Sequence, residues 1–243
     1  MTSAKTVSYG DDPHQFAEIH QPSGESRGVV VVIHGGFWKA EFDASLGRPL
    51  AASLVAEGWT AWNLEYRRVG NGGGLPRTLD DVAAGIDALA DVDGLDTSKV
   101  ITLGHSAGGH LATWAASRGR FQRWQPERVP VTGVVSQAGV LDLRSAHELG
   151  LGGGAVEAFL GHPPGPDDDQ VDPLRQVPVD VPVRCVHGRG DTTVPISQST
   201  TYVDAATAAG AGAALVEVDG DHFVVIDPTG PAWAQTLDLL DSL

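Results

Sequence analysis

The sequence has little sulfur, little positive charge and few aromatic side chains. Its 243 residues include one cysteine, one methionine and 6% aromatic residues. The single cysteine, Cys185, can form no internal disulfide, which favours a reducing compartment, and we expect a cytoplasmic protein. Cys185 also lies inside an expected strand, and buried thiols are usually inert, so a catalytic cysteine is disfavoured.

Positive charge is scarce as well, and this excludes two classes of partner. Lysine and arginine total 16 against 31 aspartate and glutamate residues, which gives a formal net charge of −15. Nucleic-acid phosphates and anionic membrane surfaces both require basic residues, so we expect neither as a partner. The polar start of the chain resembles no signal peptide, and no apolar run is long enough to span a bilayer.

Short apolar runs and helix-compatible stretches alternate along the chain. The expected strands are 29–33, 60–64, 100–103, 131–135, 183–187 and 214–218, and the expected helices are 44–57, 78–92 and 231–240. A hairpin is expected from 6–9 and 15–20. Such alternation predicts a single α/β domain over 1–243, with a mostly parallel central sheet and helices on both faces. Functional residues then gather at the carboxyl ends of the strands.

Residues 104–108 read Gly-His-Ser-Ala-Gly and follow the expected strand 100–103. A G-x-S-x-G pattern between a strand and a helix holds its serine on a sharp turn. Ser106 is therefore the candidate nucleophile, and the amide of Ala107 lies at a helix N-terminus that favours negative charge. The alternative interpretation is a glycine-rich turn with a solvent-facing serine.

A second glycine turn, His34-Gly35-Gly36-Phe37-Trp38, follows the strand 29–33. Acyl transfer places negative charge on the former carbonyl oxygen, and backbone N–H groups stabilise that charge. We expect the amides of Gly36 and Phe37 to join that of Ala107 in an oxyanion hole. An ordinary strand-to-helix turn is the alternative. The order, with the oxyanion loop before the nucleophile, favours the hydrolase interpretation.

Two polar residues that follow later strands complete a set for nucleophilic catalysis. Asp191 lies beyond the strand 183–187, and His222 lies just beyond the strand 214–218. The chain order Ser106, Asp191, His222 is the order of a hydrolase nucleophile, acid and base. We therefore predict that these residues form a catalytic triad.

With these motifs the chain resembles an α/β-hydrolase, in particular the small esterases and the arylformamidase (kynurenine formamidase) group. The group carries a His-Gly-Gly-x-Trp loop, matched here by His34 to Trp38, and an elbow like Gly104 to His110. The opening from Tyr9 to Gln15 also resembles such enzymes. Phe37 stands where the lipase-like esterases have a third glycine. The resemblance implies an enzyme that needs no cofactor.

Other features have weaker chemical interpretations. His34, His105 and His110 show no zinc-type spacing, and the glycines of 70–74 lack the lysine of a phosphate-binding loop, so we expect no metal or nucleotide site. Trp38 and His105 are candidate substrate-pocket residues. The glycine- and proline-rich stretch 139–182 is expected to be an inserted lid, because long loops in compact domains are usually functional or disordered.

The sequence therefore predicts a serine hydrolase that cleaves small carboxylic esters or aryl formamides through an acyl-enzyme. One alternative is an exopeptidase of the prolyl-oligopeptidase type, although no propeller domain is present. Another is a hydrolase-fold binding protein without catalysis, against which the intact triad argues. The expected partner is a small ester or amide, and the oligomeric state stays open.

Overall fold

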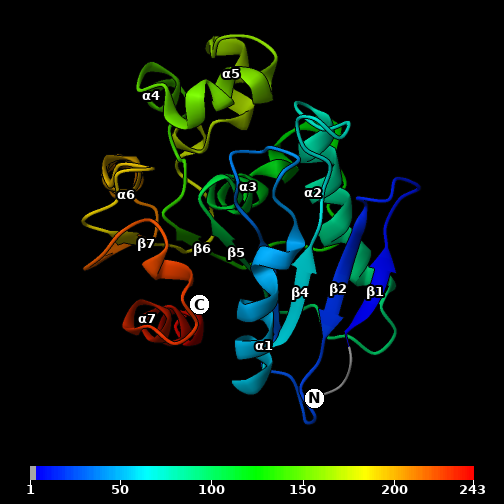
Figure 1. Ribbon diagram of the computed structural model, residues 1–243. Coiled ribbons are helices and arrows are strands. Elements are labelled where there is room, and N and C mark those ends of the chain that lie inside the picture. Colours follow the sequence, from blue (N-terminus) through cyan, green and yellow to red (C-terminus); the bar gives the residue numbers. More distant parts are fainter. Residues whose placement is uncertain (1–3) are drawn as a thin grey trace.

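The computed structural model describes residues 4–243 and is built around one eight-stranded sheet (Figure 1). The strand order is β1-β2-β4-β3-β5-β6-β7-β8. The strands are β1 (Lys5–Ser8), β2 (Phe16–His20), β3 (Val29–Ile33), β4 (Thr60–Leu64), β5 (Val100–His105), β6 (Gly133–Gln137), β7 (Val183–Gly188) and β8 (Ala213–Val218). β1 pairs antiparallel with β2, as the expected hairpin, and β2 pairs antiparallel with β4. The remaining pairs are parallel.

The central strands are buried on both faces, and their composition explains why. Every residue of β3 is buried, and its Val-Val-Val-Val-Ile sequence suits a parallel strand that is covered on both sides. Val29 and Val31 contribute to one hydrophobic core, whereas Val30 and Val32 contribute to the core on the opposite face. This alternation follows from the two-residue period of a strand.

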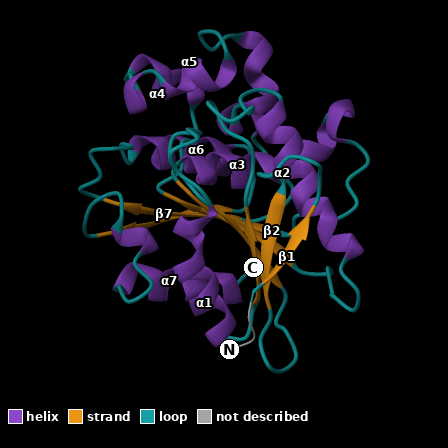
Figure 2. Ribbon diagram, turned by 45° about the vertical axis from the view of Figure 1, so that its right-hand side comes forward, coloured by secondary structure: helices purple, strands orange, loops and turns teal. Residues whose placement is uncertain are grey.

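Helices cover both faces of the sheet (Figure 2). On one face lie α2 (Arg77–Asp87), α3 (Ala107–Ala115) and α6 (Ser197–Ala208), which share a core with Val29 and Val31. On the other face lie α1 (Arg48–Ala56) and α7 (Pro231–Asp241), which pack against Val30 and Val32. Within residues 4–243, no helix combines the length and the apolar character that crossing a bilayer requires.

Most expected elements have slightly different bounds in the structure. The helix expected at 44–57 is divided into a 3₁₀ turn, η1 (Ala44–Gly47), and α1, because Pro49 suits the first turn of a new helix. The helix expected at 78–92 ends as α2 and continues as the 3₁₀ turn η2 (Ala88–Asp91). The strand expected at 131–135 is shifted to β6, which begins at Gly133.

The stretch 139–182 follows β6 and rises above the carboxyl ends of the strands (Figure 1). It contains α4 (Leu143–Glu148), α5 (Ala155–Leu160) and the 3₁₀ turns η5 (Leu151–Gly153), η6 (Pro166–Val171) and η7 (Pro173–Gln176). Backbone contacts tie it to the body of the molecule: the amide of Leu75 donates to the Phe159 carbonyl oxygen at 2.8 Å. His110 Nε2 lies 2.8 Å from the Val171 carbonyl oxygen.

Candidate active site

Ser106 occupies a sharp turn between β5 and α3. Its backbone has φ 58° and ψ −120°, a conformation that residues other than glycine rarely adopt. The flanking glycines make the turn possible: a Cβ at Gly104 would lie 2.0 Å from the Gly108 carbonyl oxygen, and a Cβ at Gly108 would lie 2.0 Å from that of Ile33. Strained positions of this kind are concentrated at functional sites.

Asp191 and His222 form a direct hydrogen bond at the ends of the neighbouring strands β7 and β8. His222 Nδ1 lies 2.6 Å from Asp191 Oδ2, and both side chains are buried. The other carboxylate oxygen accepts the backbone N–H groups of Thr193 at 2.8 Å and Val194 at 2.9 Å. Burial alone would raise the pKa of Asp191, but the hydrogen bonds that it accepts outweigh burial and hold this pKa well below its usual range.

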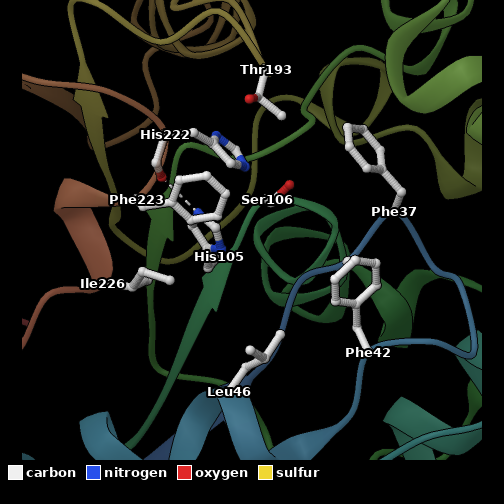
Figure 3. Close-up of a pocket in the computed structure, with 10 residues that line it drawn as sticks. Phe37, Phe42, Leu46, His105, Ser106, Thr193, His222, Phe223 and Ile226 are labelled. Atoms are coloured by element: carbon white, nitrogen blue, oxygen red, sulfur yellow. Dashed lines mark hydrogen bonds between the residues drawn. The ribbon is translucent and has the colours of Figure 1, made fainter.

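Ser106 and His222 line the same cavity at the carboxyl edge of the sheet (Figure 3). Figure 3 shows the His222 ring beside the Ser106 side chain. Asp191 lies behind His222, through the bond just described. The structure thus brings together three residues that are separated by 85 and 31 positions in the sequence (191 − 106 and 222 − 191). A hydroxyl, an imidazole and a carboxylate in this order can perform nucleophilic attack with proton transfer.

Gly36 and Phe37, in the loop after β3, line the same cavity as Ser106. Gly36 has φ 108° and Phe37 has φ 51°, so consecutive residues adopt left-handed conformations. A Cβ at Gly36 would lie 2.4 Å from the Phe42 side chain, which explains why glycine stands there. Within residues 4–243, no acceptor is hydrogen-bonded to the backbone N–H of Phe37 or of Ala107. These donors are therefore available to a ligand oxygen.

A buried cluster of side chains contacts His34 at the start of this loop, and no sequence motif marks it. The Glu65 carboxylate pairs with Arg68 and accepts the backbone N–H of Ala44 at 2.8 Å. The Tyr66 hydroxyl donates to the His34 carbonyl oxygen at 2.7 Å, and the two rings are stacked. Burial and the nearby Arg68 guanidinium lower the pKa of His34 to about 3, so His34 is neutral near pH 7. Contacts between residues 34 and 68 depend on the fold, which explains why no local motif marks them.

The cavity in front of Ser106 has a volume of about 170 Å³ and carries no lysine, arginine, aspartate or glutamate on its walls. It is lined by Gly36, Phe37, Phe42, Leu46, His105, Ser106, Thr193, His222, Phe223 and Ile226. Four large apolar side chains of the described residues are strongly exposed, and three of them, Phe42, Leu46 and Phe223, belong to this wall. Clustered exposed apolar side chains mark a binding surface.

The two candidate pocket residues are placed differently. His105 lines the cavity, and its Nε2–H donates to the His222 carbonyl oxygen at 2.9 Å. Burial lowers the pKa of His105 to about 3, so its ring is neutral near pH 7. Trp38 does not line the cavity. It is fully buried, stacks on Phe159 at 4.8 Å and donates from Nε1 to His110 at 3.3 Å, because the turn at residue 38 directs its ring toward α5.

The stretch 139–182 supplies none of the residues that line this cavity. It approaches from behind: a Cβ at Gly152 would lie 2.5 Å from the Phe37 ring, and Lys39 Nζ donates to the Gly152 carbonyl oxygen at 2.9 Å. It therefore reaches the cavity wall through Phe37, and at its start the Val140 amide donates to the Ser106 carbonyl oxygen at 3.3 Å. Among residues 4–243, no group of three or more His, Cys, Asp or Glu side chains is arranged to hold a metal ion.

The parallel sheet, the strained serine turn and the residues beyond β7 and β8 define the α/β-hydrolase fold. The chain belongs to the BD-FAE family, whose model matches residues 18–205. A truncated carbohydrate esterase from gut microbiota superposes with a TM-score of 0.83 at 20% identity, over 99% of this chain and 96% of that chain. An esterase from the Planctomycetes species Thermogutta terrifontis superposes with a TM-score of 0.80 at 22% identity, over 99% and 91%.

Curated relatives are similar in sequence over part of their length. Esterase LipC of Mycobacterium tuberculosis is 29% identical over 219 residues, which cover 82% of this chain and 54% of that protein. Isoprenylcysteine alpha-carbonyl methylesterase ICME of Arabidopsis thaliana is 26% identical over 244 residues, which cover 89% and 55%. The chain thus spans about half the length of these relatives.

Proposed function

We propose that this chain is a serine carboxylesterase that acts as a single catalytic domain on small, uncharged esters. The observation that carries the proposal is the hydrogen bond of 2.6 Å between His222 Nδ1 and Asp191, with His222 beside Ser106 on one cavity wall. The names of the relatives, LipC and ICME, agree with an ester substrate.

In the proposed reaction, the Ser106 hydroxyl oxygen attacks the ester carbonyl carbon while His222 Nε2 accepts the hydroxyl proton. Asp191 accepts the Nδ1–H bond, which orients the ring and stabilises its protonated form. The amides of Gly36, Phe37 and Ala107 form the oxyanion hole for the tetrahedral intermediate. His222 then protonates the departing alcohol, and an acyl-enzyme remains on Ser106. Water, activated by His222, releases the acid.

The cavity favours an ester with an apolar, uncharged group of modest size. Its volume of about 170 Å³ suits a short acyl chain or one ring, and its walls offer no charged side chain to pair with an ionic substrate. The cavity walls also carry no acidic residue that could pair with the terminal ammonium group of a peptide. This disfavours an exopeptidase. An aryl formamide, with a small acyl group and a flat leaving group, is a second candidate because Phe37, Phe42 and Phe223 line the cavity.

Two further proposals concern the surroundings of the site. We propose that 139–182 acts as a cap that supports Phe37 from behind, through Gly152, rather than by touching the substrate. We also propose that the protein works in the cytoplasm, where its free, buried Cys185 stays reduced.

Replacing the nucleophile tests the proposed function directly. Ser106→Ala should abolish labelling by a fluorophosphonate probe and lower kcat by roughly 10⁴-fold or more, because the reacting residues act as a unit. The measurement is kcat/KM on p-nitrophenyl esters of increasing acyl length, with N-formylkynurenine and aminoacyl anilides beside them. Acetyl and butyryl esters should lead the series.

The outcomes separate the candidates. Labelling that persists in Ser106→Ala would remove this serine from the mechanism. A wild-type chain that neither labels nor turns over any substrate would favour a binding protein. Preference for long-chain esters or for anilides would contradict the small uncharged cavity even if Ser106 is essential.

A further inference from the structure

A second histidine, in addition to His222, contacts the carboxylate of Asp191. His187 lies on β7, and its side chain is fully buried. Its Nε2 is 2.9 Å from the Val194 carbonyl oxygen and 3.2 Å from Asp191 Oδ2. That oxygen is the same one that lies 2.6 Å from His222 Nδ1. Two imidazole rings therefore share one oxygen of the acid.

The partners of His187 define where its proton lies. A carbonyl oxygen only accepts hydrogen bonds, so Nε2 carries the proton and directs it between Val194 and Asp191. The other ring nitrogen, Nδ1, is 2.8 Å from the Ser199 hydroxyl on α6, and in the neutral ring it accepts the hydroxyl proton. A continuous chain of donors thus runs from Ser199 through His187 to Asp191.

With this contact, the hydrogen-bonding capacity of Asp191 is filled. An ionised carboxylate has about four acceptor positions. One oxygen accepts the amides of Thr193 and Val194, and the other bonds to His222 and lies 3.2 Å from His187 Nε2, a contact that helps to lower the pKa of Asp191. The carboxylate can neither rotate nor gain another donor without losing one of these. Each additional donor also disperses its negative charge, which reduces its attraction for a proton on His222.

We propose that His187 is a positioning residue for the acid: it fixes the Asp191 carboxylate and, by sharing Oδ2, sets the pH at which His222 becomes an active base. The inference rests on the proposed function for the role of His222 as base. His187 touches no substrate, since it does not line the cavity. The Ser199 hydroxyl supports it by holding the required tautomer.

The other ionisable groups near this chain keep one charge state around neutral pH. His105, whose ring centroid lies 4.5 Å from that of His222, is neutral because burial lowers its pKa to about 3. Burial raises the pKa of the Cys185 thiol, which neighbours Ser199, to about 12, and burial also raises the pKa of Tyr202 on α6. Glu217 of β8 pairs with Arg189 in solvent, and Asp221 is exposed. A pH effect of His187 replacement can therefore be assigned to the Asp191–His222 pair.

The test compares variants that remove or keep the donor. His187→Phe keeps the ring volume and removes both nitrogens, whereas His187→Gln keeps an N–H donor. Ser199→Ala removes the hydroxyl that holds the tautomer. Its matched control is Tyr202→Phe, which removes another buried hydroxyl from α6, one that has no hydrogen-bond partner within the described part of the chain. The readouts are kcat and KM across pH and the thermal midpoint.

In His187→Phe we expect kcat to fall by about 10-fold or more with KM nearly unchanged, since ordering of the base matters only in the transition state. The acid limb of kcat/KM should move up by roughly 0.5 to 1 pH unit, because a carboxylate with fewer donors holds the His222 proton more strongly. His187→Gln should recover most of both effects, Ser199→Ala should show a smaller shift, and Tyr202→Phe none.

A purely structural role would lower the thermal midpoint of His187→Phe and leave the acid limb in place, and that result would overturn the proposal. So would a His187→Gln variant that behaves like His187→Phe. A second readout needs no turnover: the NMR titration of His222 in the Ser106→Ala background should shift upward on His187→Phe. If the wild type shows no Ser106-dependent activity, the proposed function fails, while this titration still decides the placement of His187.

Discussion

At the scale of single residues, sequence motifs locate some side chains of the candidate site, whereas others are brought together only by the fold. Ser106, Asp191 and His222 each follow an apolar strand, so the sequence alone locates them at one edge of the sheet. His187 also lies near the end of a strand, but its contact with Asp191 can be recognised only in the folded turn between them. Trp38 is the opposite case: its motif predicted a side chain in the substrate pocket, but the backbone turn buries its ring.

The charge states of these residues predict a simple pH profile. A base must be neutral to accept a proton, so kcat/KM should rise with pH as His222 loses its own proton. Hydrogen bonds keep the pKa of Asp191 well below its usual range, so the acid is already ionised throughout this rise. Burial lowers the pKa values of His34 and His105 to about 3, so neither should contribute to this rise.

The profile is measured with a substrate for which chemistry limits the rate. Below its midpoint, log kcat/KM should climb with a slope of about 1, as one titrating group requires. A slope of two, or a profile that stays flat through the range of histidine titration, would contradict this assignment.

At the scale of elements, the sequence located the strands better than the helices. The buried strands were predicted from β-branched runs, and β3 and β4 have the expected bounds. Helix α6 was not predicted, because Ser-Gln-Ser-Thr-Thr-Tyr offers little apolar periodicity and its burial depends on β7 and β8. The segment after β4, from Glu65 to Arg68, carries no recognisable motif, although its buried ion pair contacts His34 in the loop that carries Phe37.

Removing this ion pair should be costly. Glu65→Gln leaves the Arg68 guanidinium buried without its counter-charge, and breaking such a pair typically costs about 3 kcal/mol of unfolding free energy. The glutamine oxygen can still accept the Ala44 amide, but its NH2 group then faces the Tyr66 amide, which Glu65 accepts at 2.9 Å, so the loss combines the charge with one backbone hydrogen bond. Urea unfolding measures the effect.

The matched control is Glu217→Gln, which removes the same charge from an exposed pair with Arg189. Exposed pairs contribute little, so its unfolding midpoint should stay close to that of the wild type. Similar losses of unfolding free energy in both variants would show that burial does not increase the contribution of the Glu65–Arg68 pair to stability.

At the scale of the whole molecule, the alternation of strands and helices predicted a mostly parallel sheet between helical layers, and the strand order confirms it. Strand order across the sheet and the path of 139–182 could not be predicted, because both depend on contacts between distant segments. The net charge of −15 is also a property of the whole chain, and the walls of the cavity carry no lysine or arginine to offset it locally.

This charge should discriminate against anionic substrates in a manner that salt relieves. At low ionic strength, kcat/KM for p-nitrophenyl hemisuccinate should be far below that for p-nitrophenyl butyrate, because the field of the protein repels the carboxylate. Raising salt from about 0.01 to 0.5 M shortens the Debye length and should increase only the anionic value. Equal salt responses for the two esters would refute long-range repulsion as the cause.

The cavity wall and the stretch 139–182 are formed by different parts of the chain, and this determines where a change of sequence can alter substrate preference. Four apolar side chains of the cavity wall lie at 42–46 and 223–226, on short connections beside the sheet, and the long excursion after β6 supplies no residue of that wall. Exchanging that excursion between homologous genes should therefore leave substrate preference largely inherited from the recipient scaffold. Libraries randomised at Phe42, Leu46, Phe223 and Ile226 are where new preferences should arise.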